Sequence, residues 1–274
     1  MAQLTPFIRW AGGKTWLIPV VRGLLSGLDY NTFFEPFMGS ASVFFAIDPV
    51  HESVISDVNQ ELVDTFCAVK EKPQMVISYM RRLSNDEESY YAVRESEPKG
   101  QYKKAGRFLY LNTYSFNGLY RVNKEGKYNV PYGHRKTVYD YDKLIAASEK
   151  LQHAEILCQD FDTIRPRIHE NDLVFLDPPY AVSREENCFL KYNSTLFSLD
   201  DQYRLADLID YIIEQGAYFI LSNAAHPTIQ DLFGDKGRTI TCERNSLIGG
   251  KKAYRGKIQE LVFTNIPEQV AQGE

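Results

Sequence analysis

A continuous apolar run from Leu173 to Leu176, which ends directly in Asp177-Pro178-Pro179-Tyr180, restricts the fold of this chain more than any other segment. A strand that is apolar at every position is typical of a parallel sheet whose two faces are covered by helices. In open sheets of this class, ligands and catalytic groups lie at the carboxyl ends of the strands. The run therefore predicts a buried parallel strand with Asp177 at its functional end.

Helix and strand patterns alternate before and after this run. Apolar runs of strand length are separated by segments with helical spacing, such as Leu205, Leu208, Ile209 and Ile212. This alternation predicts an α/β fold with a parallel sheet and crossover helices. We expect strands at 32–34, 53–57, 156–158, 173–176, 218–221 and 261–263, and helices at 41–47, 62–69 and 198–215.

Residues 72–139 lack this alternation and read as helical, then loop-rich. Between Lys99 and Tyr139 there are nine lysines and arginines but one acid, Glu125, which gives a local net charge of +8. Nine aromatic residues lie in the same window, and a second basic stretch, 236–257, has a net charge of +6. Clustered basic residues favour nucleic acid as a partner. The alternative is a solvated basic surface.

The 274-residue chain as a whole has a net charge of −5, which taken alone argues against nucleic acid. The basic segments show that the charge is segregated along the chain. Four scattered cysteines form no Cys/His cluster, so we expect no metal site. The chain shows no secretory leader and no apolar stretch long enough to span a bilayer, which predicts a cytoplasmic protein without membrane contact.

The Asp-Pro-Pro-Tyr segment can hold a planar base that carries an exocyclic amine. Two prolines fix the backbone and leave carbonyl acceptors without N–H donors. The Asp177 carboxylate and the Pro178 carbonyl can accept both amine hydrogens, while Tyr180 stacks on the ring. The structural alternative is that the prolines merely end a strand and Tyr180 packs in the core.

Two further segments indicate a nucleoside-type ligand. The turn from Glu35 to Ser40 joins an expected strand to a helix, and Asp57 ends the next strand, where an acid can bind ribose hydroxyls. The alternatives are a tight turn and a helix N-cap at Asp57. The segment 10–15, Trp-Ala-Gly-Gly-Lys-Thr, is not a phosphate loop, because Ile8 stands where that loop needs glycine. We expect a glycine turn there, with or without a ligand.

The chain carries six short motifs, which are Trp10-Ala11-Gly12-Gly13-Lys14, Phe34-Glu35-Pro36-Phe37-x-Gly39, Asp57-x-Asn59, Phe116-Asn117-Gly118-Leu119-x-Arg121-x-Asn123, Asn129-Val130-Pro131-Tyr132-Gly133 and Asp177-Pro178-Pro179-Tyr180. In content and order they make the chain resemble the Dam-type (D12 class, alpha group) DNA adenine-N6 methyltransferases, which use S-adenosylmethionine. The resemblance implies a Rossmann-like methyltransferase sheet built from residues 1–70 and 140–274. It also implies an inserted, mainly helical DNA-recognition domain at 71–139 that carries a β-hairpin loop.

The resemblance also implies roles for individual residues. A flipped adenine would be held by the catalytic segment Asp177, Pro178, Pro179 and Tyr180. No metal is implied, and the product would be S-adenosyl-L-homocysteine. The implied donor-binding set is Trp10, Ala11, Gly12, Lys14, Glu35, Pro36, Phe37, Gly39, Ser40, Asp57, Asp160, Phe161 and Asp177.

For DNA, the resemblance implies that Leu119, Arg121 and Pro131 contact base edges and that Phe116 wedges into the duplex. Arginine can grip guanine with two hydrogen bonds, and apolar side chains can touch the thymine methyl group. Arg9 stands where well-known members carry a lysine that helps to read the outermost guanine. The rest of the implied DNA-binding set is Asn117, Asn123, Asn129, His134 and Arg135.

The sequence therefore predicts methyl transfer to N6 of adenine in a short site of double-stranded DNA, GATC or another site containing GAT, with base flipping. We expect a monomer of prokaryotic or phage origin, active at the nucleoid, alone or within a restriction–modification system. Two alternatives stay open. One is a methyltransferase acting on cytosine N4 or on RNA adenine, and the other is a non-catalytic DNA-binding protein on a methyltransferase fold.

Overall fold

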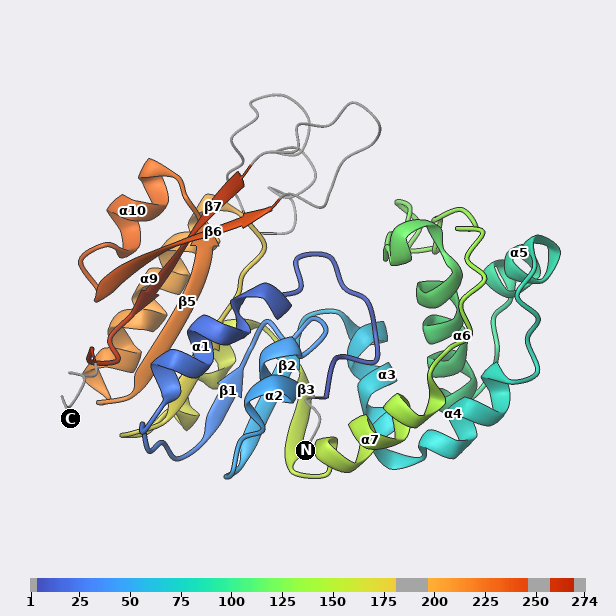
Figure 1. Ribbon diagram of the computed structural model, residues 1–274, viewed down its shortest axis with the longest axis horizontal. Coiled ribbons are helices and arrows are strands. Elements are labelled where there is room, and N and C mark those ends of the chain that lie inside the picture. Colours follow the sequence, from blue (N-terminus) through green and yellow to red (C-terminus); the bar gives the residue numbers. More distant parts are fainter. Residues whose placement is uncertain (1–3, 181–196, 246–256, 269–274) are drawn as a thin grey trace. The chain divides into compact units, whose positions relative to one another are not determined.

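The computed structural model describes residues 4–180, 197–245 and 257–268 and confirms the expected α/β class with a Rossmann-like sheet (Figure 1). Seven strands alternate with helices along these residues. The chain divides into two compact units, each made of two stretches of sequence. The first unit is Met1–Thr15 with Met38–Asp160, and the second is Trp16–Phe37 with Phe161–Glu274. The expected inserted domain at 71–139 stays a prediction.

The second unit contains five adjacent strands in the order β1-β4-β5-β7-β6. β1 pairs with β4 and β4 with β5 in parallel, whereas β7 is antiparallel to both β5 and β6. The sequence pattern did not indicate β6 or the antiparallel direction of β7. The strands are β1 (Phe33–Glu35), β4 (Leu173–Leu176), β5 (Tyr218–Ala224), β6 (Arg238–Asn245) and β7 (Lys257–Thr264), and the helices are α1 (Ile18–Leu25), η3 (Phe161–Arg167), α9 (Leu199–Glu214) and α10 (Pro227–Phe233).

Helix α9 shows how the sequence sets the bounds of an element. Ser198 and Asp201 form the expected capping box, because each side chain accepts a hydrogen bond from the other residue's backbone N–H. The apolar stripe, including Leu205 and Ile212, is fully buried. Gly216 follows the helix with a φ of +73°, a conformation that glycine adopts without steric cost. Both ends of this helix were therefore predictable.

The first unit contains a parallel strand pair, β2 (Ser53–Asp57) and β3 (Ala154–Cys158), in which Asp57 lies opposite Cys158. The short helix η1 (Thr15–Leu17) spans the boundary between the units. The other helices of the first unit are α2 (Ser42–Ile47), α3 (Gln60–Glu71), α4 (Pro73–Met80), α5 (Glu87–Glu95), α6 (Gln101–Tyr114), η2 (Phe116–Gly118) and α7 (Tyr141–Leu151).

Helices α5 and α6 share a small core with the loop that follows them. Its buried members are Tyr90, Val93, Tyr110, Leu111, Tyr114, Tyr128 and Val130. Two antiparallel bridges, Ser115 with Tyr132 and Val122 with Tyr128, make this loop a hairpin. Burial raises the pKa of Tyr128 to about 12, so its hydroxyl stays neutral and donates to the Leu119 carbonyl at 2.6 Å. The tyrosines therefore fix the hairpin to the helices.

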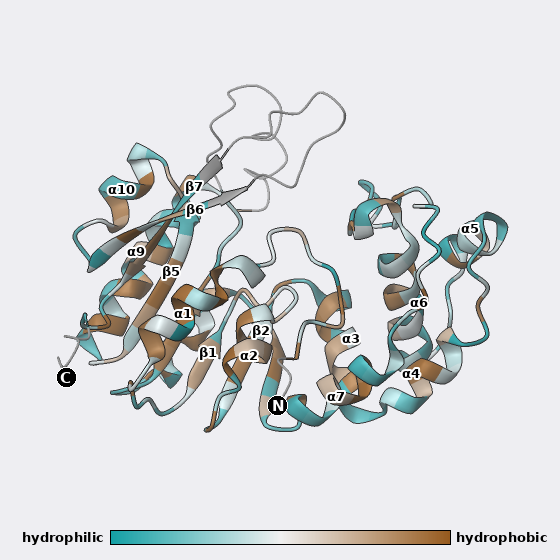
Figure 2. Ribbon diagram, in the orientation of Figure 1, coloured by the Kyte–Doolittle hydropathy of each residue, from teal (hydrophilic) through white to brown (hydrophobic). Residues whose placement is uncertain are grey.

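Apolar residues concentrate on strands β1 and β5, whereas α9 carries both hydrophobic and hydrophilic residues (Figure 2). All four residues of β4 are buried. This is the burial pattern expected for a strand with parallel neighbours on both sides. In the part of the chain that the structure describes, no helix is long and apolar enough to cross a membrane.

Two helical glycines should respond oppositely to substitution by alanine. At Gly23 in α1 an added Cβ meets no atom within 4 Å, so Gly23→Ala should stabilise the protein by about 0.5–1 kcal/mol through helix propensity. At Gly106 in α6 the Cβ would lie 2.7 Å from Cδ1 of Tyr79 and 3.2 Å from the Val76 carbonyl oxygen. Gly106→Ala should therefore destabilise the protein by about 1–3 kcal/mol. Urea unfolding of both variants measures the difference, and a gain in stability for Gly106→Ala would contradict the close packing of α4 on α6.

Candidate active site

The catalytic segment lies in the second unit, directly after β4. Because Leu176 pairs with Leu221 on β5, the next residues, Asp177 and Ser222, also lie side by side. The Ser222 hydroxyl donates to Asp177 Oδ1 at 2.9 Å. Pro178 is buried and Pro179 is exposed, so the two prolines form the step from the interior of the sheet to its surface. Asp177 is thus fixed both by the backbone that follows it and by a hydrogen bond from the neighbouring strand.

Tyr180 is held from a third strand. Its hydroxyl donates to Glu260 Oε2 on β7 at 2.5 Å and lies 3.5 Å from the Ser222 hydroxyl. Glu260 is 1% exposed and Ser222 is fully buried. The expected alternative, that Tyr180 is only a core residue, does not describe this arrangement, since its hydroxyl belongs to a polar network that includes Asp177.

Three phenylalanines form an aromatic cluster in the same unit. Phe37, after β1, stacks on Phe161 with ring centroids 5.2 Å apart, and Phe197 contacts both rings. The guanidinium carbon of Arg204 lies 4.8 Å from the centre of the Phe161 ring. Glu35, which ends β1, is 2% exposed. Phe161 and Phe197 are 3% and 4% exposed, whereas Phe37 is partly exposed, so Phe37 is the ring of this cluster that reaches solvent.

The turn around Gly39 and the end of β2 meet in the first unit. The backbone N–H groups of Gly39 and Asn59 donate to the two oxygens of Asp57, at 3.1 and 2.9 Å. Burial nevertheless raises the pKa of Asp57 above its usual value, against the opposing effect of these hydrogen bonds. The side chain of Asn59 caps α3, so the alternative that Asp57 is the N-cap is wrong. Asp57 therefore serves the turn at Gly39 rather than the helix.

The N-terminal motif forms the expected glycine turn. Gly12 has a φ of +85°, and the N–H of Gly13 donates to the Trp10 carbonyl at 3.3 Å. Trp10 lies against Gly39 so closely that a Cβ there would be 2.7 Å from the indole. Its other contacts are stacks on Tyr120 and Phe108, with ring centroids 5.3 and 6.5 Å away. The indole thus connects the turn at Gly39 with helix α6 and the hairpin. In the rest of the motif, Ala11 is exposed, Lys14 is 4% exposed, and Ser40 is 6% exposed.

A buried asparagine on α6 holds the segment that carries Arg9. Asn112, 3% exposed, accepts from the Arg9 N–H at 2.9 Å and donates to the Arg9 carbonyl at 2.8 Å. It also donates to the Gly118 carbonyl at 3.2 Å. Such bonding mimics a strand partner and satisfies backbone groups that would otherwise be buried without partners. Sequence reasoning missed Asn112; its only signal was a polar residue within an apolar helical stripe.

The hairpin presents several of the expected DNA-binding side chains to solvent. Phe116 is 53% exposed and Leu119 is 40% exposed, and Pro131 is exposed as well. Arg121 donates from Nε to the Asn129 side-chain oxygen at 2.7 Å and from Nη2 to the Asn129 carbonyl at 3.2 Å. The exposed apolar residues and the arginine therefore lie on one loop.

The remaining expected DNA-binding residues take local roles in the hairpin. Asn123 accepts from the N–H groups of Glu125 and Lys127, which closes the hairpin turn. Asn117 and His134 have positive φ values of 58° and 53°. The Arg135 carbonyl accepts from the side chain of Asn85. These contacts shape the loop without defining a role toward DNA.

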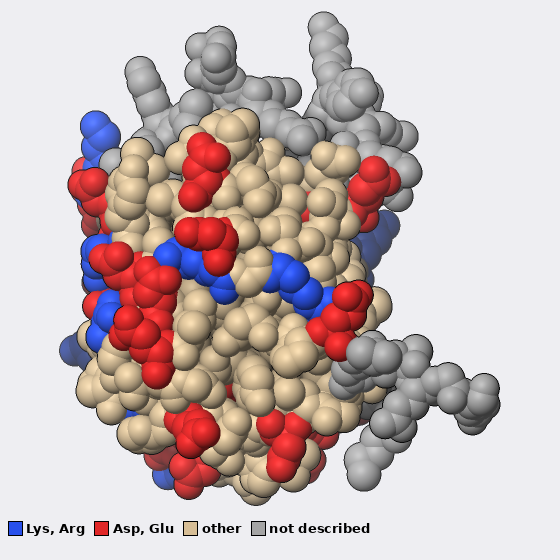
Figure 3. All heavy atoms as spheres, turned by 90° about the vertical axis from the view of Figure 1, so that its left-hand side faces the viewer, with Lys and Arg blue, Asp and Glu red and all other residues tan. Residues whose placement is uncertain are grey.

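Charge outside the hairpin is mixed in sign. On the face of the protein drawn in Figure 3, acidic and basic side chains are interspersed. Lys236 pairs with Asp210 at 2.6 Å, and Arg204 with Asp201 at 2.9 Å. Residues 246–256, which belong to the second basic stretch at 236–257, lie outside the described residues. Among the described residues, no group of three or more His, Cys, Asp or Glu side chains is arranged to hold a metal ion.

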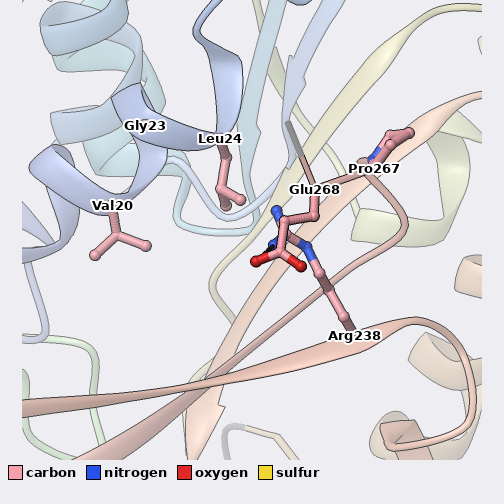
Figure 4. A pocket seen from close by; sticks show the side chains of 6 residues that line it. All are labelled: Val20, Gly23, Leu24, Arg238, Pro267 and Glu268. Atoms are coloured by element: carbon pink, nitrogen blue, oxygen red, sulfur yellow. Dashed lines mark ion pairs between the residues drawn. The ribbon is translucent and has the colours of Figure 1, made fainter. Parts of the chain in front are cut away.

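A surface cavity of about 250 Å³ lies elsewhere in the second unit (Figure 4). Its lining includes Val20, Leu24 and Pro267, together with Arg238 and Glu268, whose charged atoms are 3.8 Å apart. None of its lining residues belongs to the expected donor, catalytic or DNA-binding sets. The cavity is smaller than most sites for small molecules, which are about 300–1,000 Å³.

Comparison with known proteins confirms the family that the sequence motifs resemble. A family model described as D12 class N6 adenine-specific DNA methyltransferase matches residues 10–246. The chain belongs to this family. It is similar to a type II methyltransferase of Lactococcus lactis subsp. cremoris, with 34% identity over 276 residues and 96% of each chain covered. It is also similar to the DNA adenine methylase of Escherichia coli, with 33% identity and 99% of each chain covered. A type II methyltransferase of Methanocaldococcus jannaschii is 33% identical, with 85% of this chain and 87% of that one covered.

In this D12 class methyltransferase, each unit brings part of the expected set together. The first unit joins Trp10 and Asp57 at the Gly39 turn. The second unit links Asp177 and Tyr180 through Ser222 and stacks Phe37 on Phe161. Sequence reasoning missed the residues that support them, which are Asn112, Tyr120, Ser222 and Glu260.

Proposed function

We propose that the protein transfers the methyl group of S-adenosylmethionine to N6 of an adenine flipped out of duplex DNA, at GATC or another site that contains GAT. One observation supports this most directly. Asp177 stands at the carboxyl end of a buried parallel strand, followed by two prolines, with its carboxylate held by Ser222. A fixed carboxylate beside a rigid carbonyl suits an exocyclic amine, which has two hydrogens to donate. The family to which the chain belongs acts on this amine.

The chemistry needs little more than positioning. The lone pair of the adenine amine is delocalised into the ring, so hydrogen bonds from its two N–H groups to Asp177 and the Pro178 carbonyl would favour a pyramidal nitrogen that can react. Tyr180 would stack on the base. The donor supplies a methyl group already activated on a sulfonium, and the proton leaves the nitrogen after it has become cationic. Orientation and electrostatics then carry the rate enhancement.

The first unit's residues fit an adenosine-type donor. The Asp57 carboxylate, fixed by two backbone N–H groups, would accept the ribose hydroxyls. Gly39 has a φ of +46°, which glycine adopts without steric cost, and its N–H holds the Asp57 carboxylate in place. Trp10 and Lys14 would also contact the donor, with Ala11, Gly12 and Ser40 beside them.

The second unit's residues fit the same donor by their own contacts. Phe37 and Phe161, which stack on each other, would frame the donor's adenine. Asp160, the residue before Phe161, belongs to the first unit and would also contact the donor. Glu35 and Pro36 would complete the turn beside the donor. We propose S-adenosyl-L-homocysteine as the second product.

The DNA-binding surface would be the hairpin and the segment that carries Arg9. Residues 71–139 have an aromatic core of their own, which supports their assignment as a recognition domain within the catalytic chain 1–70 and 140–274. Phe116 would wedge into the duplex, and Leu119, Arg121 and Pro131 would contact bases. We further propose a monomer that acts in the cytoplasm of a prokaryotic host, alone or in a restriction–modification system.

Mapping of the modified base tests the proposed function directly. Plasmid DNA incubated with the purified protein and S-adenosylmethionine should contain N6-methyladenine within GAT sequences when sequenced at single-base resolution. Asp177→Ala should abolish turnover and leave DNA affinity within about threefold, because its partners are the reacting amine and the donor. Modified cytosine, modification only of RNA, or DNA binding without any modification would each overturn the proposal.

Overall DNA affinity and sequence preference should depend on two different sets of residues in and just after the hairpin. Neutralising the exposed Lys124, Lys127 and Lys136 to glutamine should weaken binding to all duplexes about equally and reduce the salt dependence of binding. Arg121→Ala should instead lower the preference for the cognate site over a site changed at one base pair by about 5- to 100-fold. Fluorescence anisotropy with matched duplexes measures both. Equal loss on both duplexes for Arg121→Ala would exclude its role in base recognition.

Donor affinity should depend on the ionisation of Asp57. Only the carboxylate can accept from both ribose hydroxyls, so affinity for S-adenosyl-L-homocysteine should be constant above the pKa of Asp57. It should fall by up to about tenfold per pH unit below that pKa. Because burial raises this pKa, the loss should begin at a higher pH than for an ordinary aspartate. Isothermal titration calorimetry at constant ionic strength, with Asp57→Asn as a control, checks this. A wild-type affinity that stays flat down to pH 4 in folded protein would refute it.

A further inference from the structure

We propose that Ser222 and Glu260 are positioning residues for methyl transfer. Ser222 sets the rotation of the Asp177 carboxylate, and Glu260 sets the Tyr180 ring, so that both keep the orientation that a flipped base requires. This rests on the proposed function, since it assigns support to the same catalytic segment. Neither residue belongs to a sequence motif of the site, and they reach it from β5 and β7.

The strand register places three of these side chains, Asp177, Ser222 and Glu260, close together. Asp177 follows Leu176, which pairs with Leu221, so Asp177 and Ser222 are neighbours across the parallel pair β4–β5. On the antiparallel pair β5–β7, Ala224 lies opposite Glu260 and Ser222 opposite Val262. Ser222 and Glu260 are therefore diagonal neighbours on one face of the sheet, because side chains two positions apart share a face. The approach of Ser222 to Glu260 is therefore set by strand pairing and does not depend on a flexible loop.

The distances form a continuous polar chain. The Ser222 hydroxyl lies 2.9 Å from Asp177 Oδ1 and 3.5 Å from the Tyr180 hydroxyl, which is 2.5 Å from Glu260 Oε2. One end of the chain is the carboxylate expected to accept the amine hydrogens, and the other is the interior of the sheet. The hydroxyl of Ser222 contacts both catalytic side chains.

Burial makes a purely structural role for these groups costly. Ser222 is fully buried and Glu260 is 1% exposed. Transferring a carboxylate to the interior costs several kcal/mol in general, and apolar residues of similar volume often stabilise such a site better. Polar groups at these two positions are therefore better explained by the side chains that they orient than by the stability of the strands.

Each hydrogen bond removes one rotation from the catalytic segment. A carboxylate turns about its terminal torsion with little hindrance, and a tyrosine side chain changes rotamer about its Cα–Cβ bond. The bond from Ser222 fixes the plane of the carboxylate, and the bond to Glu260 fixes the position of the tyrosine hydroxyl and with it the Cα–Cβ rotamer. Misplacement of a reacting group by about 1 Å can lower a rate on the order of 100-fold. Loss of either bond should therefore lower the rate of chemistry and leave ligand affinity nearly unchanged.

Single-turnover methylation at saturating DNA and S-adenosylmethionine tests this. Ser222→Ala should lower the rate constant about 10- to 100-fold, with dissociation constants for DNA and donor within about twofold of wild type. Glu260→Ala and Tyr180→Phe should each lower it, and the double variant should lose little more than the worse single variant. Glu260→Gln should restore most of the rate lost in Glu260→Ala, because its amide oxygen still accepts from the tyrosine hydroxyl.

A matched control separates positioning from stability. Thr264 on β7 is also fully buried and donates its hydroxyl to the Phe219 carbonyl at 2.6 Å, away from the catalytic segment. Thr264→Val should lower the melting temperature without changing the rate. Wild-type rates in both Ser222→Ala and Glu260→Ala would overturn the proposal, and so would a rate loss in Thr264→Val equal to that in Ser222→Ala. If the wild-type product is not N6-methyladenine, the proposed function fails independently of these comparisons.

Discussion

Strand β4 imposes the constraint on which the second unit depends. It pairs with parallel strands on both sides, and all four of its residues are apolar and buried, so none of them supplies a polar group. Any chemistry on this strand has to lie where it ends. Two prolines then turn the chain out of the sheet and leave Asp177 at the edge. The same hydrophobic burial that holds the sheet together thus decides where its carboxylate stands.

Buried polar side chains provide the order that apolar packing does not. Asn112 binds the backbone of Arg9 on one side and of Gly118 on the other, which fixes the N-terminal segment against the start of the hairpin. Trp10, one residue along, stacks on Tyr120 of the hairpin and lies against Gly39. The hairpin and the turn that carries Gly39 are therefore joined through packed, hydrogen-bonded groups. Hydrophobic contact alone is non-directional and would leave the segment free to shift.

Much of this fold follows from local sequence. The predicted strand at 53–57 is confirmed at its bounds, and the helix predicted from its Ser198 cap runs from Leu199 to Glu214, because periodicity and capping are local properties. The pattern did not indicate β6, whose eight residues mix charged and polar side chains with two apolar ones, as an edge strand allows. The antiparallel direction of β7 was also beyond the pattern, since direction is set by distant partners.

The candidate site also contains residues that local sequence identifies and residues that it does not. Asp177 and Tyr180 belong to a contiguous motif and could be picked out from the chain. Their supports Ser222 and Glu260 are 45 and 80 residues away from the residues they contact, and nothing local marks them. Asp57 shows the opposite case. Local sequence offers it as the N-cap of a helix, whereas in the structure Asn59 caps α3. What sequence cannot supply is the register between distant strands.

The aromatic residues of 99–139 also have a different role from the one that their spacing suggested. Interleaved with lysines, they favoured contact with nucleic acid, yet Tyr110, Tyr114 and Tyr128 are buried in the core that joins the hairpin to α5 and α6. Phe116 is the large aromatic side chain of this window that is more than half exposed. Lys124, Lys127 and Lys136 are exposed as well.

The basic and the aromatic residues of this window therefore have different roles. The tyrosines fix the loop to the helices, and the basic side chains and one phenylalanine face solvent. A chain with a net charge of −5 can thus present a positive loop to DNA, because charges farther away than a Debye length of about 8 Å are largely screened and the nearby exposed charges dominate the local field.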